Sequence, residues 1–298
     1  MTPPPLHGHA VRRRSVLSVP ASDSRKSAKA LASSADEVVL DLEDAVAADE
    51  KDAARGLVGQ LLKEHRGRER GRTVVRVNQP GSPWCDLDLA LLAALPQGPA
   101  AVVVPKVESA HDLAFVDRLL DGVEARSGRT SPLRVQALIE TPAGLARVHE
   151  IAHASLRLEA LVLGYADLAA SLGMPGSPST SSELWLPAQQ AVVVAARSAG
   201  IAAVDGPHLG VQVDEAFTRS AARARAMGFD GKWAIHPQQL EHLNEVFTPT
   251  EHEVLHARAV LDALERSRVD GRGAVQLDGQ MLDEAVAVAA RRVLAQSS

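Results

Sequence analysis

The sequence predicts an α/β fold of the (β/α)8 TIM-barrel type with a helical extension at its C-terminal end. Short β-branched runs alternate with longer alanine- and leucine-rich stretches, eight times in all. A chain of 298 residues is long enough for one such barrel. Polar residues also gather where the predicted strands end. The main alternative is an open doubly wound sheet, which periodicity alone does not separate from a barrel.

The predicted strands are apolar without interruption. Val38, Val39 and Leu40 form one such run. Strands of this kind are typical of parallel sheets that helices cover. The eight strands are expected at residues 15–19, 37–41, 73–77, 101–105, 134–139, 160–164, 201–205 and 231–235. No Gly-x-Gly-x-x-Gly follows the first of them and no P-loop is present, which disfavours a nucleotide-binding doubly wound sheet.

Capping signals mark several of the helices between these strands. Ser109 and Asp112 form a capping-box pattern before an apolar series. Thr248, with Pro249 at the first helical position, predicts the start of another helix. Gly228 stands where a helix is expected to end.

The two ends of the chain differ from the repeating pattern. Residues 1–14, with three prolines and an arginine run, are expected to form a flexible tail and not a secretory signal, because no apolar segment follows them. This predicts a cytoplasmic protein. Residues 15–265 make up the expected catalytic barrel domain. Residues 266–298 are expected to form a polar, glycine-containing linker and then a lid helix over 281–294.

Composition excludes several classes of protein. Lysine and arginine total 32 against 37 acidic residues, a net charge of −5, which argues against a general nucleic-acid-binding surface. The single cysteine, Cys85, excludes a disulfide framework and a multi-cysteine metal site. No apolar run approaches the ~20 residues that span a bilayer. Neither nucleic acid nor membrane is therefore an expected partner.

In a barrel of this type the chemistry lies at the C-terminal ends of the strands. An arginine within a buried-strand pattern, as Arg76 is, needs an anion nearby. Acidic residues after a strand can instead cap the next helix, Lys106 can extend to solvent, and His236 before Pro237 is typical of a turn. The polar residues that the predicted strands place at this end are Asp41, Glu43, Asp44, Arg76, Asn78, Lys106, Glu108, Glu140, Asp167, Asp205 and His236.

Glu140 and Asp167 follow the fifth and sixth predicted strands, which are neighbours in a barrel. Two carboxylates at adjacent strand ends can share one hard cation, while substrate and water oxygens complete its ligand set. Mg²⁺ prefers such ligands. Zinc is disfavoured because no cysteine cluster and no close histidine pair stands at a strand end.

A set of ordered segments points further. They are RSVLSVP at 14–20, ADEVVLDLEDAV at 35–46, RVN at 76–78, PKVE at 105–108, IETPAG at 139–144, GYADL at 164–168, GKWAIHP at 231–237 and LDGQMLD at 277–283. Through them the sequence resembles the HpcH/HpaI aldolase and citrate lyase β-subunit (CitE-like) family, in its branch of CoA-ester lyases. The segments follow the family's order and cover nearly the whole chain after the tail.

The resemblance implies a TIM barrel with Mg²⁺ held by Glu140 and Asp167. It implies that Arg76 contacts the substrate at the reacting centre. The remaining acidic residues of the second strand end would orient waters on the metal; they are Asp41, Glu43 and Asp44.

The resemblance also implies roles for residues elsewhere in the chain. Arg25 and Lys29 match positions that hold the phosphates of CoA, and Trp233 and Ala234 match a stretch that lines the substrate pocket. Asp283 matches a carboxylate on a C-terminal lid that reaches the active site of a neighbouring subunit. A homo-oligomer, a trimer or a dimer of trimers, is therefore implied.

The implied reaction is a reversible Claisen-type cleavage of a β-hydroxyacyl-CoA, such as citramalyl-CoA or malyl-CoA, to an acyl-CoA and an α-keto acid. Arg76 would stabilise the enolate and Asp283 would act as general acid or base. The alternatives are a citrate lyase β-subunit acting on a carrier-bound citryl thioester, a malyl-CoA thioesterase and an aldolase of non-thioester hydroxy-keto acids. A non-catalytic binding protein on a degenerate barrel is disfavoured, because Arg76, Glu140, Asp167 and Asp283 are all present.

Three positions depart from the usual family pattern. Relatives often place an aromatic residue near Ser18 and a glycine at Ala21, and many have an arginine near Gln189. These changes leave the acyl group and the CoA preference open.

Overall fold

The computed structural model describes residues 11–65, 71–175, 179–180, 182–269, 275–277 and 279–297. Its contacts divide the chain into two compact units, one of residues 13–244 and one that contains residues 245–298. The first unit is the predicted barrel. The division falls inside helix α10 (Leu240–Val246) and so precedes residue 265, where the sequence places the end of the barrel domain.

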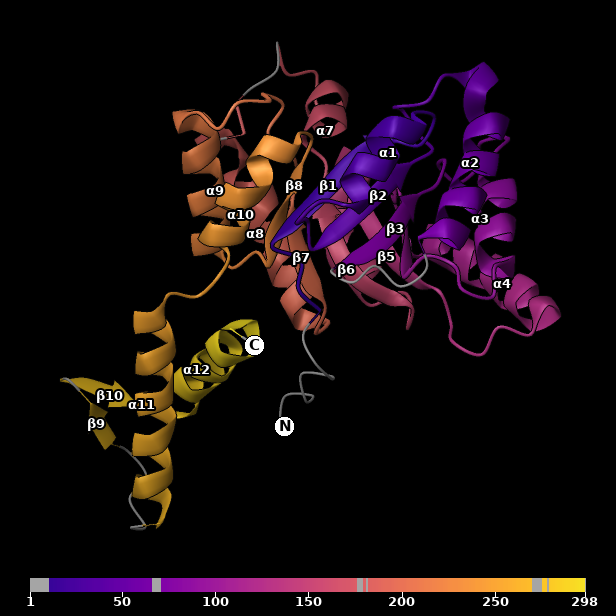
Figure 1. Cartoon of the computed structure of the whole chain (residues 1–298). Coiled ribbons are helices and arrows are strands. Elements are labelled where there is room, and N and C mark those ends of the chain that lie inside the picture. Colours follow the sequence, from indigo (N-terminus) through magenta and orange to yellow (C-terminus); the bar gives the residue numbers. More distant parts are fainter. Residues whose placement is uncertain are drawn as a thin grey trace. The chain divides into compact units, whose positions relative to one another are not determined.

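Eight parallel strands close into a barrel, as predicted (Figure 1). Each strand pairs with the next along the chain, and β8 pairs with β1 through Val16 opposite Trp233. The closure excludes the open sheet. The strands are β1 (Ser15–Pro20), β2 (Glu37–Asp41), β3 (Arg72–Arg76), β4 (Ala101–Val104), β5 (Arg134–Ile139), β6 (Leu158–Leu163), β7 (Ala202–Asp205) and β8 (Gly231–Ala234).

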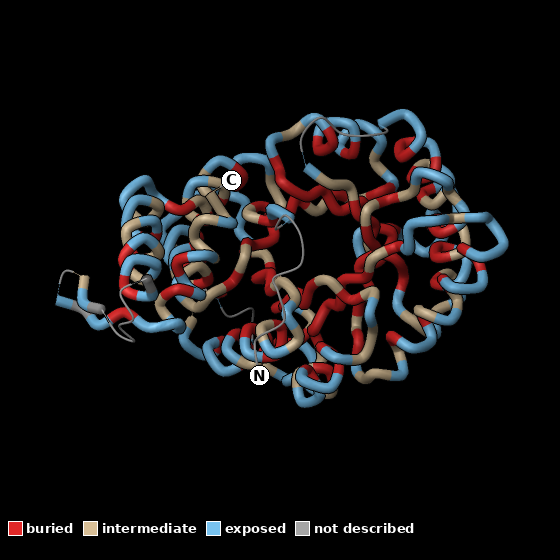
Figure 2. Tube along the Cα trace, turned by 90° about the horizontal axis from the view of Figure 1, so that it is seen from below, coloured by how far each residue is buried: buried red, intermediate tan, exposed pale blue. Residues whose placement is uncertain are grey.

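Helices surround this barrel, and Figure 2 shows their outer faces exposed around a buried inner ring. Ser109 and Asp112 form the predicted capping box, and Gly228 ends its helix in the left-handed conformation. The helices are α1 (Ser24–Leu31), α2 (Lys51–Glu64), α3 (Cys85–Ala94), α4 (Ala110–Ser127), α5 (Pro142–Ala146), α6 (Val148–Ala152), α7 (Tyr165–Ser171), α8 (Leu186–Ser198), α9 (Glu215–Met227) and α10, with short 3-10 turns η1 (Ala48–Glu50), η2 (Glu183–Trp185) and η3 (Pro237–Gln239).

Side chains from all eight strands fill the barrel interior. Small and β-branched residues dominate this core, as they do in barrels of this class. Trp233 from β8 is the largest side chain of the cluster. The cluster consists of Val16, Val39, Val74, Ala101, Val103, Leu138, Val162, Val204 and Trp233.

A network of ion pairs lies at the N-terminal end of the strands. Glu159 accepts from Arg13 at 2.7 Å and from Arg72 at 2.9 Å. Glu37 accepts from the Gln136 amide at 2.8 Å and lies 3.4 Å from Arg72. Arg13 is buried, although the sequence places it in a flexible tail. Residues 11–14 are described and residues 1–10 lie outside the described chain.

The described residues after 250 form two helices and a hairpin of the second unit. They are α11 (Glu251–Val269), β9 (Val275–Leu277), β10 (Gln280–Leu282) and α12 (Glu284–Ser297), and β9 and β10 are antiparallel. An apolar cluster joins them, in which Ala257, Val260 and Ala263 of α11 pack with Leu282 and Ala290. None of the helices in the described part of the chain has the length and apolar composition of a membrane span.

Two helix starts predicted for this region are wrong. Helix α11 begins at Glu251, because the Thr250 hydroxyl accepts the Glu253 N–H at 3.2 Å. Pro249 therefore precedes the cap and is not the first helical residue. The last helix begins at Glu284 and not at Met281, because Asp283 accepts the Val286 N–H at 3.1 Å and Met281 belongs to β10.

Candidate active site

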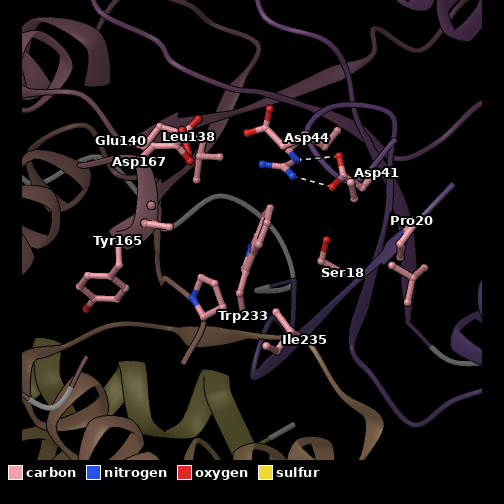
Figure 3. Close-up of a pocket in the computed structure, with 16 residues that line it drawn as sticks. Ser18, Pro20, Asp41, Asp44, Leu138, Glu140, Tyr165, Asp167, Trp233 and Ile235 are labelled. Carbon is pink, nitrogen blue, oxygen red and sulfur yellow. Dashed lines mark hydrogen bonds and ion pairs between the residues drawn. The ribbon is translucent and has the colours of Figure 1, made fainter. Parts of the chain in front are cut away.

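A cavity of about 420 Å³ opens at the C-terminal ends of the barrel strands (Figure 3). Its size is typical of a small-molecule site. Residues far apart in the sequence converge on it because parallel strands end at one edge of the barrel. Six of the predicted site residues line it, and they are Asp41, Asp44, Arg76, Glu140, Asp167 and Trp233.

Arg76 is held in a fixed orientation by two carboxylates. It ends β3 directly opposite Asp41, the last residue of β2. Its Nε and Nη2 donate to the Asp41 carboxylate at 2.8 Å and 2.5 Å, and its Nη1 lies 2.9 Å from a Glu43 oxygen. Burial disfavours the charged form, but both carboxylates raise the pKa of Arg76 above its ordinary value. Each terminal nitrogen carries a second N–H, so Arg76 keeps donors for a ligand.

Hydrogen bonds from buried groups hold the loop after β2 in place. Asp41 accepts the Glu43 N–H at 2.9 Å, and buried Lys51 donates to the carbonyls of Leu42 and Glu43 at 2.7 Å and 2.8 Å. Glu43 therefore stands against Arg76 and does not line the cavity. Asp41 and Glu43 are thus partners of Arg76. That they orient waters on a bound metal ion stays a prediction.

Glu140 and Asp167 lie at the same end of the cavity (Figure 3). Glu140 directly follows β5, and Asp167 lies in the first turn of α7. Burial, together with the charges of Asp167 and Glu43, raises the pKa of Glu140 to about 8. A cation between the two carboxylates would relieve that repulsion.

The two carboxylates fit a hard divalent cation. Both offer oxygen, which Mg²⁺ prefers. Gly164 leaves room for Glu140, because a Cβ at position 164 would stand 2.6 Å from the Glu140 Oε2. Among the described residues no three His, Cys, Asp or Glu side chains form a ready metal cluster. Water or substrate oxygens would therefore have to complete the ligand set.

Lys106 contacts carboxylates on both sides of the barrel mouth, those of the loop after β2 and that of Asp167. The sequence did not assign it this role. Its Nζ lies 2.5 Å from Glu43, 3.1 Å from Asp44 and 3.6 Å from Asp167. The side chain is 24% exposed and its ammonium pairs with these carboxylates, so the structure favours the site role over the alternative of extension into solvent. The sequence signal was its position directly after a buried strand, in the segment that begins with Pro105.

Trp233 stands in the middle of the lining residues (Figure 3). Its ring packs among the strand side chains inside the barrel, and it is 4% exposed. Its indole Nε1 has no hydrogen-bond partner among the described residues. A buried polar group without a hydrogen-bond partner is uncommon in folded proteins. Neighbouring Ala234 is fully buried and does not line the cavity.

Asp205, expected at the barrel mouth, is instead buried below it. It pairs with buried Lys232 at 2.5 Å and accepts from the Tyr165 hydroxyl at 2.5 Å. Gln189 donates to the same hydroxyl at 2.7 Å. The departure at Gln189 therefore concerns the support of Tyr165, one of the residues that line the cavity.

Two further strand-end residues have structural partners. The Asn78 main-chain and side-chain N–H groups donate to Asp88 at 2.9 Å and 2.7 Å. His236 accepts the Gln238 N–H at 3.3 Å and caps η3, as the turn interpretation expects.

The remaining predicted residues lie outside the cavity lining. Arg25 and Lys29 are exposed on α1. Asp283 belongs to the C-terminal unit, where it is exposed and caps α12. Their roles toward CoA and in acid–base chemistry stay predictions.

Known proteins resemble this chain over most of its length. Residues 14–237 match the model of the HpcH/HpaI aldolase/citrate lyase family. The L-malyl-CoA/beta-methylmalyl-CoA lyase of Cereibacter sphaeroides is 40% identical over 273 residues, which cover 86% of this chain and 85% of that protein. The citrate lyase subunit beta of Escherichia coli is 38% identical over 287 residues, 96% of this chain and 93% of that protein.

A solved structure resembles it as well. CitE from Mycobacterium tuberculosis, in complex with magnesium, acetoacetate and coenzyme A, matches with a TM-score of 0.76 and 31% sequence identity. The match covers 97% of this chain and 99% of that chain.

Proposed function

This chain belongs to the HpcH/HpaI aldolase/citrate lyase family, and on that premise we propose that it cleaves a β-hydroxyacyl-CoA thioester of the malyl-CoA or citramalyl-CoA type. The products are an acyl-CoA and an α-keto acid, and the reaction is reversible. The protein is an enzyme of the lyase class, to which its named relatives belong. The proposed substrate follows the malyl-CoA lyase relative, and the proposed metal follows the magnesium-bound CitE.

The orientation of Arg76 beside Glu140 and Asp167 is the observation that carries the proposal. In the cleavage direction a base takes the proton of the substrate hydroxyl, the hydroxyl oxygen becomes a carbonyl, and the electron pair of the broken carbon–carbon bond is left on the acyl thioester. The thioester oxygen then becomes negative and needs a hydrogen-bond donor already in place. Asp41 and Glu43 hold the guanidinium so that its remaining N–H groups can meet that oxygen.

Glu140 and Asp167 would hold Mg²⁺, whose chemistry when bound is to polarise the oxygen that becomes the keto group. The protein's own side chains supply the rest of the binding site. The Trp233 N–H, which is buried and has no partner among the described residues, would donate to a substrate oxygen. The Trp233 ring and the apolar residues beside it, such as Leu138 and Ile235, exclude water from the developing charge.

The enolate must gain a proton at carbon, and we assign that transfer to Asp283. Its carboxylate is exposed on the C-terminal unit, as an acid–base group that serves another subunit must be. The proposal thus includes a homo-oligomer, a trimer or a dimer of trimers, in the cytoplasm. Arg25 and Lys29, exposed on α1, would hold the CoA phosphates.

The test is a cleavage assay with (S)-citramalyl-CoA and with malyl-CoA, in Mg²⁺ and in EDTA. The expected result is Mg²⁺-dependent release of acetyl-CoA together with pyruvate or glyoxylate, and the faster substrate names the acyl group. Free CoA with intact malate would replace the lyase by a thioesterase.

A citrate lyase β-subunit is the second candidate, because its Escherichia coli relative covers 96% of this chain. It would act on a citryl thioester of a carrier subunit. No turnover of either CoA thioester, together with cleavage of a carrier-bound citryl thioester, would favour it. Turnover of free hydroxy-keto acids alone would favour the aldolase.

A further inference from the structure

Lys106 joins the two predicted metal ligands through different parts of the same residue. Its main-chain N–H donates to the Glu140 Oε1 at 2.9 Å. Its ammonium lies 3.6 Å from Asp167. It is not among the residues that line the cavity, although Asp44 and Asp167, which its ammonium contacts, are.

The backbone of Lys106 is strained. Among the described residues it is the only one other than glycine with a positive φ, at 51°. The chain leaves the strand ladder after Val104 and rejoins it at Val107, whose N–H donates to the Leu138 carbonyl at 3.3 Å. This excursion frees the Lys106 N–H for Glu140. Glycine adopts such a conformation without strain, so a lysine here indicates that the side chain is used.

The side chain also reaches the residues that hold Arg76. Glu43 accepts from Lys106 through one oxygen at 2.5 Å and lies 2.9 Å from Arg76 through the other. Asp44 pairs with the same ammonium at 3.1 Å. The ammonium therefore ties the loop after β2 to Asp167 across the barrel mouth.

We propose that Lys106 is a positioning residue that fixes the spacing of Glu140, Asp167 and Glu43, and through them the geometry of the metal site and of Arg76. The proposal rests on the proposed function, in which Glu140 and Asp167 bind Mg²⁺. In it the N–H orients Glu140, and the ammonium keeps Glu43 and Asp167 from separating under their mutual repulsion.

A purely electrostatic role and a positioning role of Lys106 predict opposite changes in metal affinity when its ammonium is removed. Five carboxylates surround the site (Asp41, Glu43, Asp44, Glu140 and Asp167), against the cations Arg76 and Lys106 and, behind the loop after β2, Lys51. By Coulomb's law alone, removal of a positive charge from this cluster would tighten the binding of a divalent cation. Loss of positioning would weaken it.

The experiment measures Mn²⁺ binding by electron paramagnetic resonance and Mg²⁺ binding by calorimetry, both without substrate. Lys106→Met removes the ammonium, Lys106→Gly also relieves the backbone strain, and Lys106→Arg keeps the charge. The control Lys63→Met makes the same change on an exposed face of α2. Urea unfolding checks that each variant is folded.

We expect Lys106→Met and Lys106→Gly to bind both ions about 10–100-fold more weakly, as is usual for lost supports of metal ligands. Lys106→Arg should recover part of the affinity, and Lys63→Met should equal the wild type. Glycine should not rescue binding although it suits the backbone, because the ammonium is absent.

Equal or tighter binding by Lys106→Met and Lys106→Gly would overturn the positioning role while leaving the metal site in place, provided that Asp167→Asn loses binding. A wild-type protein that binds neither ion would overturn the metal site itself and with it the role of Lys106.

Discussion

Gly164 lies directly against Glu140, so that a Cβ at position 164 would stand 2.6 Å from both the Cβ and the Oε2 of the glutamate. The close approach places the carboxylate of one strand end over the backbone of the next. It predicts that Gly164→Ala displaces the carboxylate and weakens Mg²⁺ binding by about 10–100-fold. Calorimetric titration with Mg²⁺ measures the loss.

Gly56→Ala is the matched control for this change. Gly56 lies on the exposed face of α2, where an added Cβ meets nothing within 4 Å. That substitution should leave Mg²⁺ affinity unchanged and add roughly 0.5–1 kcal/mol to the free energy of unfolding. If Gly164→Ala binds Mg²⁺ with the same affinity as the control, the close approach of Gly164 to Glu140 does not influence metal binding.

Arg76→Lys should reduce kcat with either hydroxyacyl-CoA by about 10²–10³-fold. A lysine keeps the charge but cannot pair with both Asp41 oxygens and also present oriented N–H groups to the thioester oxygen. Steady-state assays at saturating substrate measure the effect. A variant that keeps wild-type kcat would remove Arg76 from the reacting centre.

Mg²⁺ should stabilise the folded protein. A ligand that binds only the native state, present at about one hundred times its Kd, adds about 2.7 kcal/mol to the free energy of unfolding. Urea unfolding with and without Mg²⁺ tests this, and Glu140→Gln combined with Asp167→Asn should abolish the difference. Stabilisation that survives in this double variant would place the ion elsewhere.

Lys232→Met should destabilise the barrel by roughly 3–5 kcal/mol, because it leaves the charge of Asp205 buried without its partner. Both side chains are fully buried. Adding Asp205→Asn should restore much of the loss, since the amide oxygen can still accept from Tyr165. Urea unfolding of the single and double variants measures this. A double variant no more stable than the single one would rule out a charge effect.

The free energy of unfolding should fall as pH drops below about 6.5. Burial lowers the pKa of His208, and Lys232 lowers it further while Asp214 opposes them. Near and below the ordinary value of about 6.5 the unfolded chain binds a proton that the folded chain does not, which favours unfolding. Unfolding in urea between about pH 7.5 and 5.5 measures the slope.

His208→Asn should flatten this pH dependence. His208 is buried and contacts the Thr180 hydroxyl at 3.0 Å through Nδ1, whereas His111 is exposed at the start of α4. His111→Asn should therefore keep the wild-type slope. Equal slopes in the two variants would mean that another group titrates.

The strands were predictable because burial on both faces leaves a continuous apolar run in the sequence, as at Val102–Val104. The convergence of Arg76, Glu140 and Asp167 followed from strand ends alone. Side-chain partners did not. Asp205 could point into the barrel mouth or pair with Lys232. The outcome depends on which side chains the neighbouring strands β7 and β8 place next to each other, and the local sequence does not contain that information.

Lys106 shows the same limit at the level of the backbone. Its positive φ arises because the chain must rejoin β5 at Val107 while one N–H turns to Glu140. Local propensity disfavours this conformation for lysine. Similarly, Thr250 and not Thr248 caps helix α11 because of the position of Glu253. The N–H and the hydroxyl of Thr250 both donate to the Glu253 carboxylate.

The ion pairs at the N-terminal end of the barrel strands join residues from its two halves. Arg13, Glu37 and Arg72 come from the first half of the chain, and their surplus positive charge meets Glu159 only when β6 is in place. Gln136 from β5 donates a further hydrogen bond to the Glu37 carboxylate. A half-barrel of β1 to β4 would lack Glu159, so Arg13 and Arg72 gain their shared counterion only in the complete ring.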